Sequence, residues 1–565
     1  MESIRIKGAE ALLRALLEEK VDTVFGYPGG SIITVFDALY SFRDSIRQIL
    51  TRHEQGAIHA AQGFARVTGE PGVVFVTSGP GATNVITGLA DAMLDSTPLV
   101  VIAGQVSSPL LGSDAFQETD VVGISLPVSK WSYQVRTAAE IPWAVARAFY
   151  IAREGRPGPV VLDITKDAQN EMTDYVYEKC QFIRSYQPNP DLDQTAVEEA
   201  AALINGAKRP FALVGQGVIL GEAEEALKAF LTKADIPAGA TLLGLPAVAG
   251  GFPLMKGMLG MHGNVGPNRK TAECDVLIAI GMRFDDRVTG DLKTYAKQAK
   301  IIHFDIDPAE IEKNIKVDVA VLANVKESLP AVTALLKEAS HKDWVDSFKE
   351  HEDEEWQRVI EPEIHPTAGP ITMGEVINMV SEKAAANAVL ATDVGQNQMM
   401  ACRYFKLQSN RSLVTSGGLG TMGFGLPAAI GAAIGAPERE VCLFTGDGGI
   451  QMTIQELGTI MEYKPAVKII ILNNKFLGMV RQWQELFFRE RYSSTILQNP
   501  DFPMIAAAYG IPGRKVVKRE GLAEAIDELF ATKGSFLLEV EVEENGMVYP
   551  MIPAGTNVDN LIFGD

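Results

Sequence analysis

The stretches Val441-Cys-Leu-Phe-Thr-Gly-Asp-Gly-Gly449 and Lys468-Ile-Ile-Ile-Leu-Asn-Asn474 decide the fold of this 565-residue chain. Each is a short apolar run that ends in small or polar residues, which is typical of a buried parallel strand leading into a turn. Between them, the residues from about Thr453 to Glu462 predict a helix. Because parallel strands end at the same edge of a sheet, Asp447 and Asn474 are expected to lie together at a ligand-binding edge.

The same order of elements occurs near the N-terminus. Val76-Thr-Ser-Gly-Pro-Gly81 resembles Leu443-Phe-Thr-Gly-Asp-Gly448, and Pro98 and Pro465 follow the two turns at the same distance, each before an apolar strand. Short β-branched runs alternate with helical patterns along the whole chain. The sequence therefore predicts an α/β protein of three doubly wound parallel-sheet domains, two of which share one topology and invite a ligand between them.

Two breaks divide the chain into three blocks. The first break is Tyr186-Gln-Pro-Asn-Pro-Asp191, whose two prolines interrupt helix and internal strand alike. The second is a charge-dense helix followed by Pro362, Pro366 and Pro370, which we interpret as a solvated helix and a linker. The length agrees with this division at about 150 residues per domain. We expect a first domain over 1–186, a central domain over 187–345, a linker over 346–369 and a third domain over 370–565.

The composition and charge of the chain exclude several classes of protein. The formal net charge of −20 opposes a nucleic acid or an anionic membrane as the main partner. The cysteines, Cys180, Cys274, Cys402 and Cys442, show no CxxC spacing and predict neither a disulfide framework nor a zinc site. Met1-Glu-Ser-Ile-Arg5 lacks the apolar segment of a secretory signal, and the apolar runs are strand-sized. We therefore expect a cytoplasmic protein without a membrane span.

The turn around Asp447 has the composition of a metal and phosphate site. Mg²⁺ prefers oxygen ligands and is often completed by phosphate oxygens, so we expect Asp447, the Asn474 amide oxygen and a backbone carbonyl near Phe476 to hold it. Glycines let backbone N–H groups approach a phosphate at a helix start, and three flank this aspartate: Gly446, Gly448 and Gly449. A tight strand-to-helix turn would explain Gly-Asp-Gly alone. Followed by Asn-Asn at this spacing, it resembles the thiamine diphosphate motif.

A second group of motifs lies in the first block. Glu54, within Arg52-His-Glu-Gln-Gly-Ala57, stands where a strand over 46–50 meets a helix, a position that the helix dipole alone would favour for a glutamate. Together with Phe25-Gly-Tyr-Pro-Gly-Gly30 and Thr77-Ser-Gly-Pro-Gly-Ala-Thr-Asn84, it resembles the pyrimidine-binding domain of thiamine diphosphate enzymes. The resemblance implies that the Glu54 carboxylate faces the aminopyrimidine ring and that Gly26 belongs to the catalytic set.

In the third block the same resemblance implies further cofactor contacts. Within Gly417-Gly-Leu-Gly-Thr-Met-Gly-Phe-Gly-Leu-Pro427, it puts Gly420 at the cofactor and Met422 under it, where the side chain would enforce a bent, V-shaped conformation. Within Val394-Gly-Gln-Asn-Gln-Met-Met400, it assigns the diphosphate contacts to Gly395, Gln396 and Asn397. Relatives commonly carry His and Trp at positions 397 and 400, where this chain has Asn and Met, so an amide would have to donate to the phosphate.

Five longer motifs narrow the resemblance to one family: Ala115-Phe-Gln-Glu118, Gly155-Arg-Pro-Gly-Pro-Val160 with Lys166, Met282-Arg-Phe-Asp-Asp-Arg-Val-Thr-Gly290, Leu477-Gly-Met-Val-Arg-Gln-Trp483 and Val548-Tyr-Pro-Met-Ile-Pro553. Taken singly, each could be a surface charge cluster or a piece of the core. Together they resemble the large catalytic subunit of acetohydroxyacid synthase, also called acetolactate synthase, of the biosynthetic FAD-containing type. The resemblance covers essentially the whole chain.

The family resemblance implies a reaction. Pyruvate is decarboxylated on thiamine diphosphate, and the resulting hydroxyethyl carbanion condenses with a second 2-keto acid, which is pyruvate or 2-ketobutyrate. The products are 2-acetolactate or 2-aceto-2-hydroxybutyrate, in the first common step of branched-chain amino acid biosynthesis. The implied cofactors are thiamine diphosphate, Mg²⁺ and FAD.

The resemblance also implies where the substrates bind. Arg287 grips the carboxylate of the second keto acid, a role that suits a permanent, fork-shaped cation. Trp483, with Met479 and Val480, narrows the acceptor pocket and favours 2-ketobutyrate by about 1–3 kcal/mol per methylene. Further residues border the centre from a neighbouring subunit: Phe116, Gln117 and Lys166. A homodimer or a tetramer is therefore the expected assembly, and a small regulatory subunit is left open as a further partner.

The central block carries a dinucleotide signal. Val214-Gly-Gln-Gly-Val-Ile-Leu-Gly221 follows a strand and opens a helix, although this glycine pattern alone is weak. The family resemblance implies FAD contacts at Arg156, Gly215, Gln216, Gly217, Thr241, Leu242, Gly281, Arg283, Asp305 and Asp318. Because the reaction has no net redox change, the flavin is expected to be structural.

Four other functions stay as alternatives. The catabolic acetolactate synthase, which lacks the flavin, is opposed by Arg283-Phe-Asp-Asp-Arg287 and Trp483, and glyoxylate carboligase, which lacks the glutamate, is opposed by Glu54. A flavin-dependent pyruvate oxidase would pass electrons to FAD. A non-catalytic binding protein of the same fold would have lost Asp447 and Asn474, which are present. Valine feedback, the choice of dimer or tetramer and the preferred acceptor are not predicted.

Overall fold

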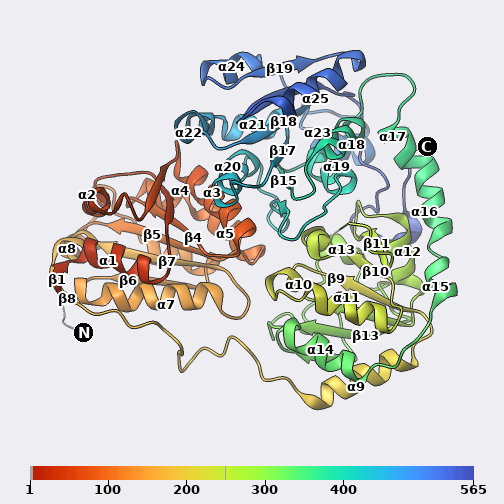
Figure 1. Cartoon of the computed structure of the whole chain (residues 1–565), viewed down its shortest axis with the longest axis horizontal. Helices are drawn as coiled ribbons and strands as arrows, with labels where there is room; N and C mark the ends of the chain where they lie inside the picture. Colours follow the sequence, from red (N-terminus) through yellow and green to blue (C-terminus); the bar gives the residue numbers. More distant parts are fainter. Residues whose placement is uncertain (1–3, 249, 565) are drawn as a thin grey trace.

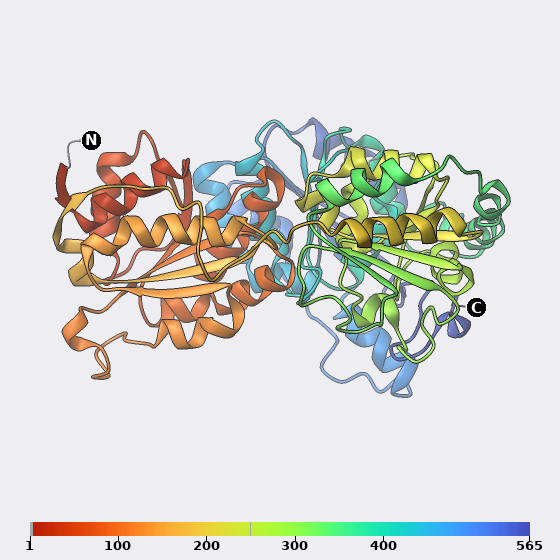
Figure 2. The ribbon, with the colours of Figure 1, turned by 90° about the horizontal axis from the view of Figure 1, so that it is seen from below.

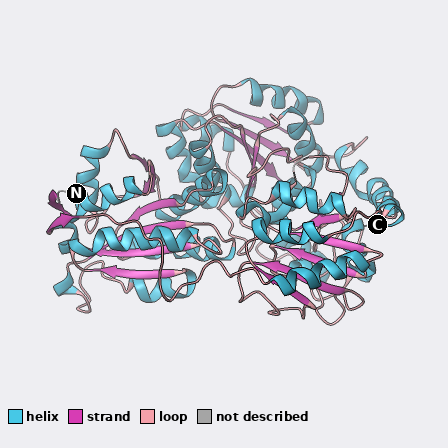
Figure 3. Ribbon diagram, turned by 60° about the horizontal axis from the view of Figure 1, so that its bottom comes forward, coloured by secondary structure: helices cyan, strands magenta, loops and turns pink. Residues whose placement is uncertain are grey.

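The computed structural model describes residues 4–248 and 250–564, so Met1 to Ser3 of the N-terminal stretch lie outside the described residues. In the described part, three six-stranded sheets form three domains. Figure 1 shows the first domain in red and orange, the central one in yellow and green and the third in cyan and blue. Helices lie on both faces of the sheets (Figure 3), which confirms the predicted α/β fold. None of the described helices has the length and apolarity that a membrane span requires.

The first sheet is parallel, and its central strands are buried along their whole length, as expected for strands covered on both faces. Its strand order is β3 (Arg47–Leu50), β2 (Thr23–Gly26), β4 (Gly72–Val76), β5 (Leu99–Gln105), β7 (Pro159–Thr165) and β6 (Trp131–Val135). The helices of this domain include α1 (Gly8–Glu18), α2 (Ile33–Phe42), α3 (Glu54–Thr68), α4 (Pro80–Asn84), α5 (Ile86–Leu94), α6 (Val121–Ser125), α7 (Ile141–Arg153) and α8 (Lys166–Asn170). An antiparallel pair, β1 (Ile4–Lys7) and β8 (Met172–Tyr175), accompanies it.

The third sheet repeats this topology. Its order is β16 (Leu413–Val414), β15 (Val389–Thr392), β17 (Val441–Gly446), β18 (Val467–Asn473), β20 (Phe536–Glu541) and β19 (Gly513–Val516). In chain order both sheets run second, first, third, fourth, sixth, fifth, and all the pairings are parallel, so the predicted pair of like domains is confirmed. Its helices include α18 (Met373–Lys383), α19 (Gln396–Tyr404), α20 (Gly425–Gly435), α23 (Gly478–Phe487), α24 (Phe502–Ala508) and α25 (Leu522–Ala531).

The central sheet has a different order, with the first strand in the middle. The strands run β11 (Met255–Met258), β10 (Ala238–Ala240), β9 (Pro210–Val214), β12 (Val276–Ile280), β13 (Lys300–Asp305) and β14 (Val319–Leu322). This order, 3-2-1-4-5-6, is that of dinucleotide-binding sheets, whose ligands bind where the order reverses, between β9 and β12. Its helices are α9 (Gln194–Gly206), α10 (Gly217–Leu220), α11 (Glu224–Lys233), α12 (Val265–Glu273), α13 (Asp286–Thr289) and α14 (Val325–Leu335).

The first and third domains meet along α3 and α20, which approach each other through small residues. A Cβ added at Gly63 would overlap the carbonyl oxygen of Ala428, and one added at Gly431 would overlap that of Ala60. The two glycines thus make reciprocal backbone contacts. In Figure 2 the same structure is seen from below, with the first domain (red and orange) beside the central domain (yellow and green).

The charge-dense segment before Pro362 is helical, as predicted, and most of its residues are exposed. The segment forms α15 (Lys342–Asp346), α16 (Lys349–Glu355), a π-helical turn over Trp356–Ile360 and α17 (Glu361–Ile364). Its Glu355 is buried and pairs with Arg403 of α19, while its other oxygen accepts from the backbone N–H of Val265 at 2.8 Å. A buried carboxylate needs such partners, so the end of α16 at Glu355 contacts both the central and the third domain, while the rest of the helix faces solvent.

The predicted helix over about 453–462 is present: a 3₁₀ turn over Ile454–Glu456 continues directly into α22 (Leu457–Tyr463). A separate short helix, α21 (Asp447–Met452), precedes it. Thr453 separates the two, because its backbone leaves the helical region and its hydroxyl donates to the carbonyl of Gly423 at 2.8 Å.

Candidate active site

Asp447 and Asn474 leave neighbouring strands at the same edge of the third sheet. β17 and β18 pair in parallel, with Gly446 opposite Leu472. Asp447 is the first residue of α21 and is buried, and burial raises the pKa of its carboxyl to about 6. The Asn474 amide oxygen accepts from the Phe476 backbone N–H at 3.2 Å, which turns the chain back at the strand end.

The donor atoms at this edge are those that Mg²⁺ prefers. The described residues hold no cluster of three or more His, Cys, Asp or Glu side chains arranged for a metal. A metal held here would therefore use the Asp447 carboxylate together with amide and carbonyl oxygens, as Mg²⁺ does when phosphate and water complete its shell. The residues present fit that group.

Glycine turns leave an open cradle beside these residues. A Cβ added at Gly420 would meet only Val394 Cγ1 within 4 Å, at 3.8 Å, and one added at Gly395 only Asn397 Nδ2, at 3.7 Å. Both glycines have positive φ, +71° and +123°, and Gly395 directly precedes α19. Backbone N–H groups at a helix start with free space before them suit a phosphate.

Two other glycines of the predicted set serve packing instead. A Cβ at Gly448 would lie 2.7 Å from Leu477 Cδ2 and 3.8 Å from Met422 Cε, so Met422 lies over the same turn. A Cβ at Gly449 would lie 2.5 Å from the Asp393 carboxylate. The turn is therefore built without side chains because neighbouring groups fill the space.

The side chain of Gln396 is not free for a phosphate. Its Nε2 donates to Gln482 Oε1 at 3.1 Å and its Oε1 accepts from Asn474 Nδ2 at 3.1 Å. Only the backbone N–H of Gln396 is left for the predicted contact. Asn397 differs: its Nδ2 donates to the Val394 carbonyl at 3.3 Å, and its buried Oδ1 has no partner in the described part of the chain.

Asp393 organises the turns at Gly395 and before α20, and the sequence motifs did not indicate it. Its carboxylate accepts backbone N–H bonds from Val394 at 2.8 Å and from Gly423 and Gly425 at 3.0 Å each. Burial raises its pKa. The residue ties the turn at Gly395 to the one that precedes α20, and only its place at the end of β15 would have pointed to it.

Asn499 is a second residue of the site that the sequence motifs did not indicate. Its Nδ2 donates to Asp447 Oδ2 at 2.6 Å and to Asn473 Oδ1 at 3.1 Å, so it fixes one oxygen of the candidate metal ligand. The partners are far apart in the sequence, and Asn499-Pro500 carries no local signal of this contact.

Glu54 lies at the start of α3, as predicted. His53 caps this helix by accepting from the Gln55 N–H at 3.1 Å, and Asn84 Nδ2 donates to Glu54 Oε2 at 3.0 Å. Gly81 leaves room beside the other oxygen, Oε1. Gly26 has a separate reason to be glycine, because a Cβ there would overlap the carbonyl oxygen of Phe75 in β4.

A cavity of about 490 Å³ lies between the three domains. It is lined by predicted residues of two domains: Gly395, Gly420, Met479, Trp483 and Arg287. The guanidinium of Arg287 is mostly exposed, and its nearest carboxylate, Asp286, lies 3.8 Å away. An exposed ion pair at that distance is weak, so the Arg287 guanidinium can bind another carboxylate.

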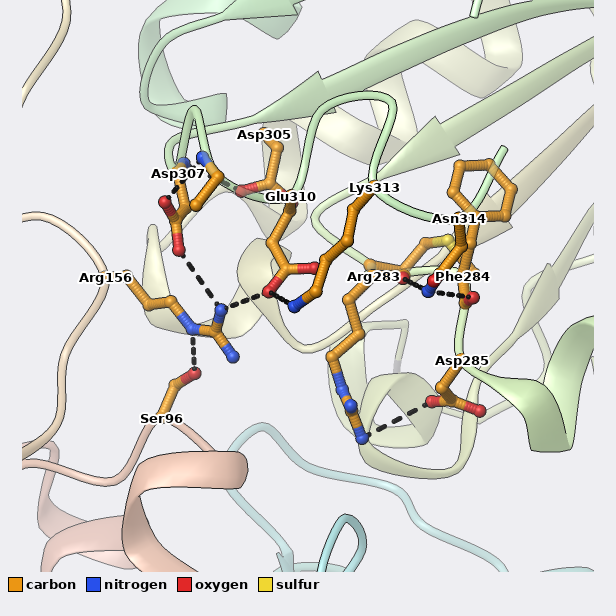
Figure 4. A network of polar contacts seen from close by, with 12 residues as sticks. Ser96, Arg156, Arg283, Phe284, Asp285, Asp305, Asp307, Glu310, Lys313 and Asn314 are labelled. Carbon is orange, nitrogen blue, oxygen red and sulfur yellow. Dashed lines mark hydrogen bonds and ion pairs between the residues drawn. The ribbon is translucent and has the colours of Figure 1, made fainter. Parts of the chain in front are cut away.

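The cavity reaches the switch point of the central sheet, where Gln216, Gly217 and Gly281 follow β9 and β12. Most of the predicted flavin contacts line it: Arg156, Gln216, Gly217, Thr241, Leu242, Gly281, Arg283 and Asp305. In Figure 4, Arg156 points to Asp307 and Glu310, at 3.2 and 2.7 Å, and Arg283 points to Asp285. A cavity with close glycine turns at a switch point fits a dinucleotide.

Two of the predicted flavin contacts do not join this wall. Gly215 packs against Gly281, where a Cβ would overlap the carbonyl oxygen. Asp318 lies at the opposite edge of the sheet, where it accepts from Lys300 Nζ at 2.7 Å and from the Ile301 N–H at 2.9 Å. It precedes β14 instead of following it, and the site lies at the carboxyl ends of the strands.

Many predicted residues do not line this cavity in the described chain. They include Gly26, Glu54, Phe116, Gln117, Lys166 and Val480, and on the metal side Asp447, Asn474, Phe476 and Met422. Phe116 is 88% exposed and Lys166 is exposed. Gln117 has φ +60° and covers the Gly79 turn near Glu54. One chain therefore presents two separate groups of candidate residues.

Comparison with known families matches the three domains in order. Residues 6–124 match "Thiamine pyrophosphate enzyme, N-terminal TPP binding domain", residues 197–332 match the central domain, and residues 393–540 match the C-terminal TPP binding domain. The first and last of these contain Glu54 and Asp447.

Curated relatives extend over nearly the whole chain. The acetolactate synthase isozyme 2 large subunit of Escherichia coli is 44% identical over 558 residues, which cover 99% of both chains. The large subunit of Parasynechococcus marenigrum is 45% identical and covers 99% of this chain and 91% of its own. The probable large subunit of Methanocaldococcus jannaschii is 42% identical, with 99% and 95% covered. The chain belongs to the acetolactate synthase large subunit family of thiamine pyrophosphate enzymes.

Proposed function

We propose that this chain forms 2-acetolactate or 2-aceto-2-hydroxybutyrate from pyruvate and a second 2-keto acid, with thiamine diphosphate, Mg²⁺ and FAD bound. Acetolactate formation on thiamine diphosphate is the activity of its family. The observation that carries the proposal is the single cavity lined by Gly395 and Gly420 on the diphosphate side and by Arg287 and Trp483 on the acceptor side. A cofactor and an acceptor acid would meet there.

Residues of the third domain would hold the cofactor. Asp447, Asn474 and a backbone carbonyl near Phe476 would ligate Mg²⁺, and the open turns at Gly395 and Gly420 would receive the diphosphate. When bound, thiamine diphosphate supplies a nucleophilic ring carbon and an electron sink for the loss of CO2. Asn397 would donate the second N–H of its amide to a phosphate oxygen, since Nδ2 already gives one to the Val394 carbonyl.

Glu54 would share a proton with the pyrimidine ring. The Asn84 amide donates to one carboxylate oxygen at 3.0 Å and so fixes its orientation at the start of α3. Gly81 keeps the space beside the other oxygen open. A carboxylate oriented in this way can hold a proton at one defined atom.

Arg287, Trp483 and Met479 would select the acceptor. The weakly paired Arg287 guanidinium would bind the carboxylate of the second keto acid in a bidentate way. Trp483 packs against Phe487 with ring centres 5.0 Å apart, which makes a rigid apolar wall next to Met479. This wall would exclude water from the pocket and limit the length of the alkyl group that the acceptor can carry.

FAD would occupy the end of the cavity at the switch point, where Gln216, Gly217 and Gly281 form close turns. Arg156 is already paired with Asp307 and Glu310, so it would hold the wall and the flavin together. The reaction needs no net electron transfer, and the flavin would act as structure.

A dimer would complete the active centre. Phe116 is 88% exposed and Lys166 is exposed, and neither lines the cavity of its own chain among the described residues, so a second copy would bring them, with Gln117, to the centre. The relatives are named large subunits, which supports a small regulatory subunit as a further partner.

The test is acetolactate formation by the purified chain from pyruvate, thiamine diphosphate and Mg²⁺, compared with Glu54→Gln. We expect kcat to fall by about 10²–10⁴ in Glu54→Gln, because proton transfer is lost, while cofactor affinity is retained. Glu224→Gln is a matched control, since Glu224 also begins a helix and accepts from an asparagine, Asn410, but lies away from the site.

Two results would contradict the proposal. One is undiminished acetolactate formation in Glu54→Gln. The other is bound FAD that bleaches with pyruvate and reoxidises stoichiometrically without acetolactate, which would identify a flavin-dependent pyruvate oxidase.

A further inference from the structure

Two buried carboxylates of the first domain hold a loop of the third. The loop, Ser416–Thr421, connects β16 to α20, contains no helix or strand, and lines the cavity with Gly417 to Gly420. Asp91 lies on α5 and Asp95 directly follows this helix, and both carboxylates are buried.

Asp95 binds the backbone of the loop. It accepts from the N–H of Gly417 at 2.8 Å and from that of Gly418 at 2.7 Å. Arg66, which is also buried, pairs with the same carboxylate at 2.6 Å. The three donors use both oxygens and fix the carboxylate in one orientation.

Asp91 binds the two ends of the loop. Its Oδ1 accepts from the hydroxyl of Ser416 and from that of Thr421, the latter at 3.0 Å. The Ser416 Oγ accepts in turn from the Thr421 N–H at 2.9 Å. The loop is therefore closed on one carboxylate oxygen of another domain.

The arrangement is costly in stability. Two buried carboxylates share one buried cation, Arg66, and the second oxygen of Asp91 has no partner among the described residues. Burial raises the pKa of both acids. Buried carboxylates without full compensation destabilise a fold, so the use of this pair lies in the backbone and hydroxyl groups of the loop that it holds in place.

We propose that Asp91 and Asp95 are positioning residues for the thiamine cofactor, because they fix the loop that carries Gly420 and leads into Met422. Through them the first domain sets the shape of the cofactor cradle in the third domain of the same chain. The inference rests on the proposed function in one respect, which is that Gly420 and Met422 contact the cofactor.

Asp163 provides a matched control. It is buried in β7 of the same domain, and one oxygen accepts from Gln105 Nε2 at 3.2 Å and from Gln134 Nε2 at 2.9 Å. Its other oxygen has no partner in the described chain, as in Asp91. None of the contacts of Asp163 in the described chain involves the loop. Asp163→Ala therefore also removes a buried carboxylate but leaves the loop in place.

The experiment measures the Kd of thiamine diphosphate by isothermal titration calorimetry on the full chain at saturating Mg²⁺, at a temperature where every variant is folded. We expect Asp91→Ala and Asp95→Ala to bind at least about tenfold more weakly, as when a hydrogen bond to a charged group is lost. Asp163→Ala should stay within about twofold of wild type, because it leaves the loop unchanged. Asp91→Asn retains the accepting oxygen and should recover most of the affinity.

Unchanged affinity in both alanine variants would overturn the proposal, as would equal weakening in Asp163→Ala. If Asp91→Ala does not fold, the double variant Ser416→Ala with Thr421→Val decides, since it removes the two hydroxyl donors and should weaken binding by about three- to tenfold. A wild-type chain that binds no thiamine diphosphate would overturn the proposed function instead, so the two failures are distinguishable.

Discussion

The first and third domains share one topology but carry different chemistry at corresponding turns. After β4 the first domain has Gly79-Pro80-Gly81, and after β17 the third has Gly446-Asp447-Gly448. A helix begins at the middle residue in each case, α4 at Pro80 and α21 at Asp447. The same turn therefore holds a proline in one domain and a buried carboxylate in the other.

The acid of the first domain lies at another strand end. Glu54 follows β3 at the start of α3, whereas the corresponding helix of the third domain, α20, begins within Phe424-Gly425-Leu-Pro427 and has no acid there. The fold supplies equivalent strand ends, and the residue placed at each one decides the chemistry. Neither domain alone has both carboxylates.

The largest expected effect tests the turn of the third domain. Asp447→Asn removes the charge that Mg²⁺ needs and should lower acetolactate formation by about 10³ or more, the loss of several kcal/mol of charge stabilisation. The measurement is kcat/KM for pyruvate over a range of Mg²⁺ concentrations.

Pro80→Ala changes the corresponding residue of the first domain and serves as the control. Proline at the first helical position only preorganises the turn, so we expect a loss of about 1 kcal/mol in stability and little change in Mg²⁺ dependence. Equal losses of Mg²⁺ response in the two variants would show that the two turns do not differ in function.

The second effect concerns the packing of α3 on α20. Gly63→Ala and Gly431→Ala should each destabilise the chain by about 1–3 kcal/mol, because each Cβ would overlap a backbone carbonyl of the other helix. The double variant should cost less than the sum, since one shift of the helices relieves both overlaps. Thermal unfolding midpoints report this.

Gly206→Ala is the control for that pair. Its Cβ would meet no atom within 4 Å, at the end of α9 in the central domain. It should stay within about 0.5 kcal/mol of wild type. An additive double variant would mean that α3 and α20 do not move as one contact.

The strand ends and the repeated topology could be predicted because their signals are local. Apolar runs followed by Gly-Asp-Gly or Asn-Asn identify β17 and β18 directly, and the repeat identifies β4 and β5. The predicted domain limits, at 186/187 and around 346–369, stay predictions, as do the roles of the individual site residues.

What could not be predicted depends on contacts between distant segments. The loop at Ser416 meets Asp91 and Asp95 from another domain, and no local pattern reports such a pairing. The hydrogen bond from the Gln396 side chain to Gln482 likewise joins segments that are far apart in the sequence. The family pattern that includes Asp318 does not say at which end of a strand a residue lies, and in the structure Asp318 pairs with Lys300 and the Ile301 N–H before β14.

The third prediction concerns the residues that cover the two corresponding turns, the one at Gly79 and the one at Asp447. The backbone of Gln117 covers Gly79 in the first domain, and the side chain of Asn499 covers Asp447 in the third. Asn499→Ala should weaken Mg²⁺ binding by about tenfold, because a residue that orients a metal ligand typically contributes that much. Calorimetric titration with Mg²⁺ in the presence of thiamine diphosphate measures it, and unchanged affinity would mean that the contact only closes the surface.

The smallest effect tests how the third domain holds the acid of the first. Glu456, in the 3₁₀ turn after α21, accepts from the backbone N–H of Arg52 at 3.0 and 3.2 Å, next to the cap of the helix that carries Glu54. Burial raises the pKa of the Glu456 carboxyl from 4.5 to about 6. The domains therefore support each other's sites: Glu456 supports α3, and Asp95 supports the loop before α20.

This shift gives a pH dependence with a defined sign. Between pH 4.5 and 6 the folded chain holds more protons at Glu456 than the unfolded chain, so this group lowers stability as the pH rises through that window and leaves it unchanged below it. Glu456→Gln should remove that slope, which amounts to about 1–2 kcal/mol. Glu462→Gln is the control, because Glu462 pairs with the Arg52 guanidinium at 2.8 Å while partly exposed. The free energies of unfolding at pH 4.5, 5.5 and 7 distinguish the variants, and an unaltered slope in Glu456→Gln would mean that another group titrates at the contact between the two domains.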